Sequence, residues 1–435
     1  MADPYPIRPI SPDEFGAYAL VIQHAFHEAP IEESHLPSVL SLFEWDRTLA
    51  AFDPELDAPV GVTTIYSFQL TVPGASLPTA GVTWVAVLPS HRRRGILSSM
   101  MRRQLADIAA RGEPLAALWA SEAGIYGRYG YGRASWQLTF DVRRGENTLL
   151  GASGGLSGAS GGLAGASGRL RTRLVVPTDA RAELAKVYDL VLPTRPGFFA
   201  RSASWWDRRI HDPENRRNGA SPLRCVLAED DQGTRGYALY SGTQRWEDLT
   251  FLPDSTLEVR ELVAADAAAS ATLWSDLLSR DLVTSYRATL RPSDDPLLYQ
   301  LADPRRARPT LADGLWMRLV NVPAALSGRR YACPVDVVIE VHDSYVEANE
   351  GRWRLRTTAS SSEEDGGGFA AVCEPVTDAA DLSLDVAELG AAYLGGTRLS
   401  APAEAGLVTE HRAGAVRELS AAMSWDPAPW CPMIF

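Results

Sequence analysis

The spacing of apolar residues predicts a helix near the start of the chain. Between residues 12 and 28, apolar positions recur every three or four residues, as on one face of an amphipathic helix. A polar, proline-containing stretch then interrupts the pattern. We expect this helix to open an α/β domain, with four residues facing inward: Phe15, Leu20, Ile22 and Phe26.

The pattern next changes to strands and then returns to a helix. Two runs rich in β-branched and aromatic residues, 59–73 and 80–88, are separated by a proline-glycine turn and predict neighbouring strands. After Gly95 the apolar residues recur at helical spacing until Gly112. The inward positions of this helix are expected to be Ile96, Met100, Met101, Leu105 and Ile108.

A strand, a turn and a helix recur later, at 257–279, and resemble the arrangement at 82–108. The first copy carries His-Arg-Arg-Arg-Gly at 91–95. The second has only Ala-Ala-Asp-Ala-Ala-Ala at 264–269, with no cation and no glycine. We therefore expect the second copy not to bind a pyrophosphate.

Composition suggests where the domains meet. Residues 151–168 form a seven-residue repeat of Gly, Ser and Ala with occasional Leu, which predicts a flexible surface insertion because glycine is a poor helix former. From about residue 306 onward, alternating strand patterns and short helices predict an α+β domain. We expect domains at 1–148, 169–305 and 306–435, with the insertion at 149–168.

Charge, cysteine content and hydropathy narrow the possible functions. A net charge of −12 disfavours nucleic acid or an anionic membrane as the main partner and favours small cations. Four cysteines without a CxxC pair predict neither a disulfide framework nor a zinc site. His24 and His27 lack a third ligand, so we expect no metal. The chain shows no signal peptide and no membrane-spanning run, which predicts a cytoplasmic protein, although export by another route stays open.

The segment with the clearest chemistry joins a strand to a basic loop. Val85-Ala86-Val87 precedes His91-Arg92-Arg93-Arg94-Gly95, and a helix follows. Backbone N–H groups and guanidinium groups gathered before a helix favour a phosphate. A free strand edge would let an extended amide-containing arm add as a short strand, and an N–H near Val87 would polarise a thioester carbonyl. The structural alternative is a solvated basic turn after a core strand.

These residues resemble a known family. Arg92-Arg93-Arg94-Gly95-Ile96-Leu97 is similar to the R/Q-x-x-G-x-G/A motif of the GNAT acetyltransferases, with Leu97 departing from the last small residue. TWVAVLPSHRRRGIL, ALWASEAGIYGRYGYG, GLWMRLVNVPAAL and a final Phe closely resemble the Eis (enhanced intracellular survival) family. The resemblance implies an α/β and α+β protein with two GNAT-like domains in tandem, the second degenerate. A sterol-carrier-protein-like domain follows, and the family assembles as hexamers.

The resemblance also implies roles for particular residues. It puts acetyl-CoA on Val85, Ala86, Val87, Arg92, Arg93, Arg94, Gly95, Ile96, Leu97, Ser98, Ser121 and Glu122. It makes Tyr126 the general acid, and a phenol with an ordinary pKa near 10 is able to protonate a departing thiolate. Tyr129 and Tyr131 are close alternatives, and the whole Gly/Tyr-rich run is also consistent with a packed turn.

The base implied by the resemblance is the C-terminal carboxylate of Phe435. Its ordinary pKa of about 3.5 makes it a weak base in bulk water, but its charge would hold a substrate ammonium while it accepts a proton. Most chain ends fray in solvent. Here the last residues are apolar and would gain by docking: Trp430, Met433, Ile434 and Phe435.

The family acetylates amino groups of polycationic molecules, notably aminoglycosides, often at several positions, which gives antibiotic resistance. A wide acidic cavity would suit such acceptors, and the residues expected to line it are Glu28, Glu32, Glu33 and Trp84. Ile434, beside the proposed base, argues against strong polycation binding there. Two other classes remain open, namely a lipid- or ligand-binding protein and a host-interaction protein that acetylates protein lysines.

Overall fold

Three β-sheets organise the chain, and they belong to two units. The computed structural model describes residues 4–150, 170–360 and 367–435. The first unit consists of Met1–Ser135, Leu315–Pro429 and Ile434–Phe435. The second consists of Trp136–Gly314 and Trp430–Met433. The predicted glycine-rich repeat at 151–168 lies outside the described residues.

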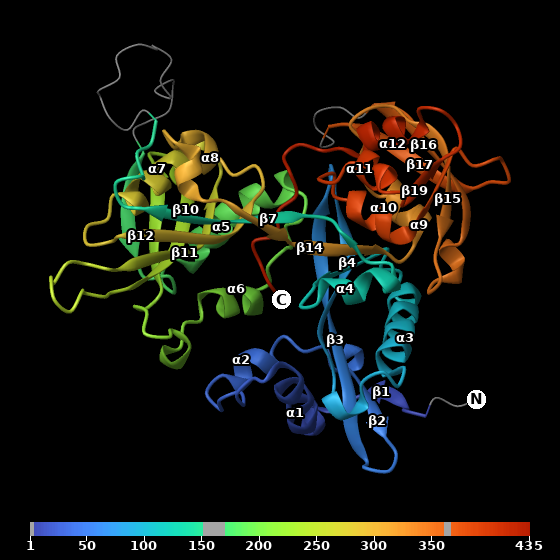
Figure 1. Ribbon diagram of the computed structural model, residues 1–435, viewed down its shortest axis with the longest axis horizontal. Coiled ribbons are helices and arrows are strands. Elements are labelled where there is room, and N and C mark those ends of the chain that lie inside the picture. The colour runs from blue at the N-terminus through green and yellow to red at the C-terminus, as the bar shows by residue number, and fades with distance from the viewer. Residues whose placement is uncertain (1–3, 151–169, 361–366) are drawn as a thin grey trace. The chain divides into compact units, whose positions relative to one another are not determined.

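The first unit contains a seven-stranded sheet with helices on both faces (Figure 1). In spatial order its strands are β1 (Ile7–Pro9), β2 (Leu49–Asp53), β3 (Ala58–Val72), β4 (Ala75–Val87), β5 (Leu115–Trp119), β14 (Leu315–Leu319) and β6 (Gly132–Arg133). Its helices are α1 (Phe15–Phe26), α2 (Leu36–Leu40), α3 (Ile96–Ala110) and α4 (Ala123–Tyr126). One face packs on α1 through Val62 and Ala86, and the other packs on α3 through Val60.

The helix predicted after Gly95 is confirmed as α3, and all five predicted inward residues are buried. The helix predicted at 12–28 is also present, as a short 3-10 turn followed by α1. Phe15 and Ile22 are buried, but the inward prediction is wrong for Leu20 and Phe26, which are 50% and 41% exposed. The stripe that meets the sheet is completed instead by Tyr18, Ala19 and Val21.

Three strands cross the predicted domain boundaries, and one of them is β13 (Thr310–Asp313), which was predicted within the third domain and lies in the second unit. β7 (Trp136–Arg143), predicted within the first domain, pairs with β12 (Ser285–Pro292) and β13 (Thr310–Asp313) in the second unit. β14, predicted within the third domain, pairs antiparallel with β5 and β6 in the first sheet. The apolar pattern identifies a strand but carries no information about its partner.

The remainder of the first unit is a five-stranded sheet with short helices. In spatial order its strands are β17 (Phe369–Pro375), β16 (Gly351–Ser360), β15 (Asp336–His342), β18 (Leu382–Asp385) and β19 (Val408–Glu410). Its helices are α9 (Val322–Ser327), α10 (Val386–Ala392), α11 (Ser400–Glu404) and α12 (Ala415–Met423). This is the predicted α+β part, and α10 packs against β6 and β14.

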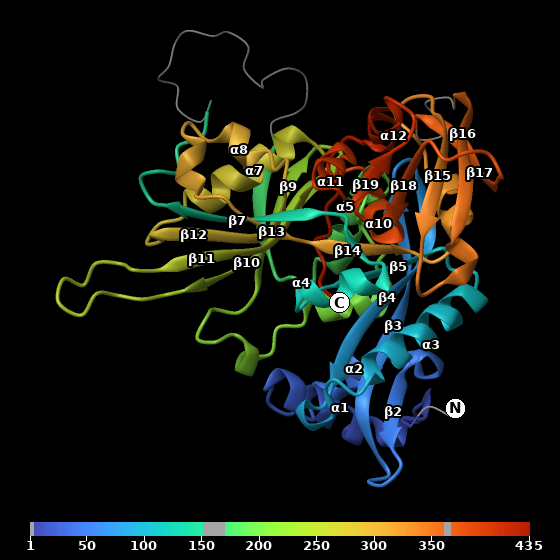
Figure 2. The ribbon, with the colours of Figure 1, turned by 45° about the vertical axis from the view of Figure 1, so that its right-hand side comes forward.

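The second unit repeats the α/β arrangement around another seven-stranded sheet (Figure 2). In spatial order its strands are β13, β7, β12, β11 (Thr256–Ala264), β10 (Gly233–Thr243), β9 (Arg224–Asp230) and β8 (Arg171–Val175). Its helices are α5 (Arg181–Val191), α6 (Ala203–Ile210), α7 (Ala267–Leu278) and α8 (Leu297–Gln300). The predicted strand-turn-helix echo is confirmed as β11 and α7.

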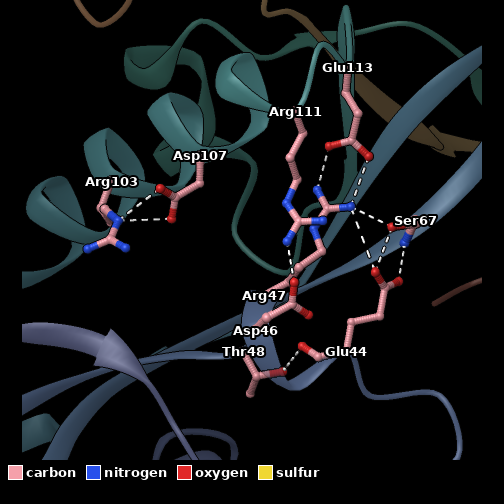
Figure 3. Close-up of polar contacts among 9 residues, drawn as sticks. All are labelled: Glu44, Asp46, Arg47, Thr48, Ser67, Arg103, Asp107, Arg111 and Glu113. Atoms are coloured by element: carbon pink, nitrogen blue, oxygen red, sulfur yellow. Dashed lines mark hydrogen bonds and ion pairs between the residues drawn. The ribbon is translucent and has the colours of Figure 1, made fainter.

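A buried ion pair fixes the loop that precedes β2 (Figure 3). Arg47 donates to the two carboxylate oxygens of Glu113 at 2.9 and 2.5 Å, and to the Ser67 hydroxyl at 2.5 Å. Glu44 accepts hydrogen bonds from the backbone N–H and the hydroxyl of Ser67, both at 2.6 Å. These contacts join the loop to β3 and to Glu113, two residues before the start of β5.

Candidate functional site

The site begins where β4 and β5 separate. The two strands pair in parallel only between Thr79–Gly81 and Leu115–Ala117, although β4 continues to Val87 and β5 to Trp119. Among the described strands, none pairs with β4 beyond Gly81 on this side. The edge at Val85–Val87 is therefore open, as the sequence predicts.

A bulge in β4 accompanies this separation. Thr83 pairs with Thr64 and Ala86 pairs with Val62, so two residues of β4 lie opposite a single residue of β3. Trp84 sits in the bulge with φ of 55°, a conformation that L-residues rarely adopt. Because a bulged strand bends and twists more strongly, the end of β4 turns away from β5.

The basic loop after β4 leads into α3 and leaves the helix N-terminus open. Gly95 precedes the helix with φ of 86°, and within the described residues no side chain caps the first turn. Arg93 is also left-handed, with φ of 63°. The N–H groups of a first helical turn have no intrahelical acceptors and carry partial positive charge, so they favour an anion such as a phosphate.

One cavity of about 690 Å³ connects the strand edge, the basic loop and the Gly/Tyr-rich turn at 124–132, called the tyrosine turn below. The predicted residues that line it are Val85, Ala86, Val87, Arg92, Arg93, Gly95, Ile96, Leu97, Ser98, Ser121, Glu122 and Tyr126. Arg94 is not among the described lining residues, because its guanidinium group donates to the hydroxyl of Tyr5 at 3.0 Å.

The three tyrosines of the turn have different surroundings. Tyr126 lines the cavity, and burial, with smaller contributions from Glu122 and Tyr129, raises its pKa to about 12. Tyr129 also lines the cavity, but its hydroxyl lies 3.3 Å from that of Ser98. The Tyr131 hydroxyl is buried without a hydrogen-bond partner among the described residues, and Tyr131 does not line the cavity.

Phe435 lies against β4 rather than in the cavity lining. Its carboxyl-group oxygen accepts a hydrogen bond from the Thr83 hydroxyl at 3.0 Å. Its ring makes an edge contact with Phe68, with 5.1 Å between ring centroids. Trp430, Met433 and Phe435 are buried, while Ile434 is 57% exposed, so the apolar chain end is docked except for one residue.

The residues predicted to line an acceptor cavity have other surroundings. Trp84 is half-buried and packs on Phe15, Tyr18 and Phe43, with 5.1 Å between the Phe43 and Trp84 rings. Glu28, with Glu32 and Glu33, is exposed in the segment after α1. None of these residues is among those described as lining the cavity.

Sequence reasoning missed part of the lining, namely Ala25, Phe26, His27, His91, Ile125 and Arg128. Arg128 was detectable as a cation inside the tyrosine turn. The contribution of α1 has no local signal, because its apolar residues look like core positions. His91 is held by Asp53 and Ser90, at 3.0 and 2.9 Å from its ring nitrogens.

The second copy differs from the first at the corresponding helix N-terminus. Asp266 caps α7, and its carboxylate accepts a hydrogen bond from the backbone N–H of Ala269 at 2.8 Å. The same carboxylate binds Arg235 at 2.9 Å. A fixed negative charge therefore occupies the position where α3 is open, which agrees with the predicted loss of pyrophosphate binding.

Comparison with known domain families identifies three matching stretches of the chain. Residues 6–134 and 197–319 each match an acetyltransferase (GNAT) domain, and residues 322–432 match a sterol carrier protein domain. An N-acetyltransferase of Streptomyces avermitilis, described as uncharacterized, is 44% identical over 90% of this chain and 90% of its own. N-acetyltransferase Eis of Mycobacterium tuberculosis is 37% identical over 84% of this chain and 83% of its own. The chain belongs to the Eis family of GNAT N-acetyltransferases.

Solved structures carry the same fold. Eis1 from Mycobacterium abscessus matches with a TM-score of 0.78 and 31% identity, covering 99% of this chain and 100% of the other. A GCN5-related N-acetyltransferase from Anabaena variabilis matches with a TM-score of 0.80 at 17% identity over 99% and 100% of the chains, which shows the fold alone. The predicted fold class is confirmed, with two GNAT domains followed by a sterol-carrier-like domain.

GNAT acetyltransferases use acetyl-CoA, and the cavity of this Eis-family chain fits its parts. The open turn of α3 and the adjacent arginines suit the pyrophosphate, and the β4 edge suits the amide-containing arm. No cluster of three or more His, Cys, Asp or Glu side chains among the described residues is arranged to hold a metal ion. Within the same residues no helix has the length and apolar character needed to cross a membrane.

Proposed function

We propose that this Eis-family protein transfers an acetyl group from acetyl-CoA to amino groups of small cationic molecules, with Tyr126 as general acid and the terminal carboxylate of Phe435 as base. The cavity carries the proposal, because it joins an open strand edge, an uncapped helix N-terminus and a buried tyrosine in one continuous space.

Binding would use two sets of backbone groups. The N–H groups at the start of α3, together with Arg92 and Arg93, would hold the pyrophosphate, and Ser98, Ser121 and Glu122 border the same space. The edge of Val85–Val87 would pair with the amide-containing arm and direct an N–H toward the thioester carbonyl. Arg94, whose guanidinium group donates to the Tyr5 hydroxyl, is not among the described lining residues.

Acetyl-CoA supplies the acetyl group as a thioester. The Phe435 carboxylate would accept a proton from the acceptor ammonium, directly or through water, so that the free amine is able to attack. Tyr126 would then donate its phenolic proton to the departing thiolate. The raised pKa of Tyr126 keeps this group protonated at neutral pH, as a general acid requires.

The Thr83 hydrogen bond supports the assignment of the base. It holds the Phe435 carboxyl group on β4, two residues before the Val85–Val87 edge. Two residues of strand span roughly 7 Å. The carboxyl group is therefore held on the strand that also provides the proposed thioester site.

For the acceptor we propose polyamine-like molecules such as aminoglycosides, acetylated at one or several positions. The net charge of −12 and the exposed Glu28, Glu32 and Glu33 support attraction of cations. The homo-hexamer expected from the family resemblance and the cytoplasmic location expected from the sequence belong to the same proposal. Measuring the particle mass in solution checks the hexamer.

The test is acetyl-CoA-dependent thiol release with kanamycin and a panel of amines and lysine peptides. Tyr126→Phe should lower kcat by about 10²- to 10⁴-fold, the range for a lost general acid, and so should an extension of a few residues beyond Phe435. Tyr131→Phe is the matched control, because it removes a hydroxyl outside the cavity lining. A wild-type chain that is inactive on every amine would contradict the proposal. Full activity of Tyr126→Phe or of the extended chain would also contradict it.

A further inference from the structure

A side chain of the sterol-carrier-like domain, Tyr345, contacts the tyrosine turn of the acetyl-CoA cavity. Tyr345, in the segment between β15 and β16, makes an edge-to-face contact with Tyr129, with 5.1 Å between ring centroids. Tyr129 is almost fully buried, lines the cavity and contacts the Ser98 hydroxyl in the first turn of α3. A line of direct contacts thus runs from the third domain to the helix that opens toward the cofactor.

The segment that carries Tyr345 is held in a fixed position. The carboxylate of Asp343 accepts hydrogen bonds from the backbone N–H groups of Tyr345 and Val346, both at 3.0 Å. The same carboxylate binds the fully buried guanidinium group of Arg318, on β14, at 2.7 and 2.8 Å. Asn349 adds a further hydrogen bond to Asp343 at 2.9 Å.

The tyrosine turn is held from its other end as well. A Cβ placed on Gly132 would lie 1.8 Å from the carbonyl oxygen of Ala387, so α10 approaches the turn as closely as backbone atoms allow. Tyr345 and Val346 pack on the same apolar cluster as Tyr126 and Tyr129. The third domain therefore contacts the turn at two places, Tyr129 and Gly132, which both follow the proposed general acid in the sequence.

We infer that the sterol-carrier-like domain positions the acetyl-CoA site, with Tyr345 acting through Tyr129 on the first turn of α3. The inference rests on the proposed function in one respect, namely that the cavity binds acetyl-CoA. An edge-to-face ring pair is more favourable than the buried area of its two rings alone would make it. Tyr345→Ala removes that pair and leaves space into which Tyr129 is able to tilt, which loosens the contact with Ser98.

The experiment is titration of the full-length chain with acetyl-CoA, read by calorimetry, together with KM and kcat. Tyr345→Ala should raise Kd and KM for acetyl-CoA about tenfold and change kcat by less than twofold. Tyr345→Phe keeps the ring and should bind like wild type. Leu407→Ala, an exposed apolar residue of the same domain, is the matched control and should also bind like wild type.

A double-mutant cycle separates positioning from general destabilisation. In a Tyr129→Leu background, Tyr345→Ala should weaken acetyl-CoA binding by less than twofold, because the group through which it acts is gone. Equal effects in both backgrounds would overturn the inference, and so would wild-type affinity of folded Tyr345→Ala. If Tyr345→Ala does not fold, Tyr345→Leu is measured in the same cycle. A wild-type chain that does not bind acetyl-CoA would overturn the proposed function as well as this inference.

Discussion

Gly95 allows folding and cofactor binding to be measured separately. It holds a left-handed conformation, with φ of 86°, immediately before α3. A Cβ built at this position meets no described atom within 4 Å. Gly95→Ala therefore introduces backbone strain of about 1–2 kcal/mol without a clash in the free protein. The melting temperature of the first unit should therefore fall by about 2–8 °C, since each kcal/mol corresponds to about 2–4 °C.

The effect on acetyl-CoA should be larger. The added methyl group would project into the space above the open N–H groups, which a bound phosphate must enter. Losing one hydrogen bond to a charged group costs about 1.5–3 kcal/mol. We expect Kd for acetyl-CoA to rise about 10- to 150-fold, measured by calorimetry alongside thermal unfolding.

Gly112→Ala provides the matched control at the other end of the same helix. Gly112 has φ of 75° and equally empty surroundings, but it does not line the cavity. Its substitution should reproduce the thermal shift and leave Kd unchanged. If Gly95→Ala binds acetyl-CoA as tightly as Gly112→Ala does, the reasoning about the open helix end is refuted.

Two further predictions concern the ion pair and the tyrosine. Arg47→Met leaves the buried Glu113 carboxylate without its partner and should destabilise the first unit by about 3–5 kcal/mol. Most of this stability should return in the double variant Arg47→Met/Glu113→Leu. Equal melting temperatures for the single and double variants would contradict this prediction. Because burial raises the pKa of Tyr126 to about 12, kcat should show no tyrosine-dependent fall below about pH 10. The stabilising contribution of protonated Tyr126 is complete below the unfolded pKa near 10 and is lost as pH rises toward 12, which alkaline unfolding monitored by tyrosine absorbance would check.

Local pattern was sufficient to predict three of the elements that line the cavity, namely β4, the basic loop and α3. α3 was predictable because five apolar residues at helical spacing follow a glycine and all become buried. The basic loop was predictable because a run of arginines followed by glycine stands between an apolar strand pattern and a helical pattern. The pattern alone did not show that the third arginine, Arg94, donates to the Tyr5 hydroxyl, because Tyr5 lies far away in the sequence.

The pattern of apolar and polar residues did not predict contacts between residues far apart in the sequence. The bulge at Trp84 depends on pairing with β3, and the buried face of α1 depends on which sheet it meets. The Thr83–Phe435 hydrogen bond joins residues 352 positions apart. Only the family resemblance pointed to Phe435, because a short apolar end gives no indication of its docking partner.

The exchange of β7 and β14 explains why the domains are not independent along the sequence. β14 is the last strand of the second GNAT match at 197–319, yet it lies between β5 and β6 in the first sheet, with Leu315, Met317 and Leu319 fully buried. It also carries Arg318, whose ion pair with Asp343 holds the segment of Tyr345. A cut at residue 148 would remove this strand, expose the edge of β5 and release the tyrosine turn. The sheet of the first GNAT domain of this Eis-family chain is therefore assembled from distant segments, and it shares one unit with the sterol-carrier-like domain.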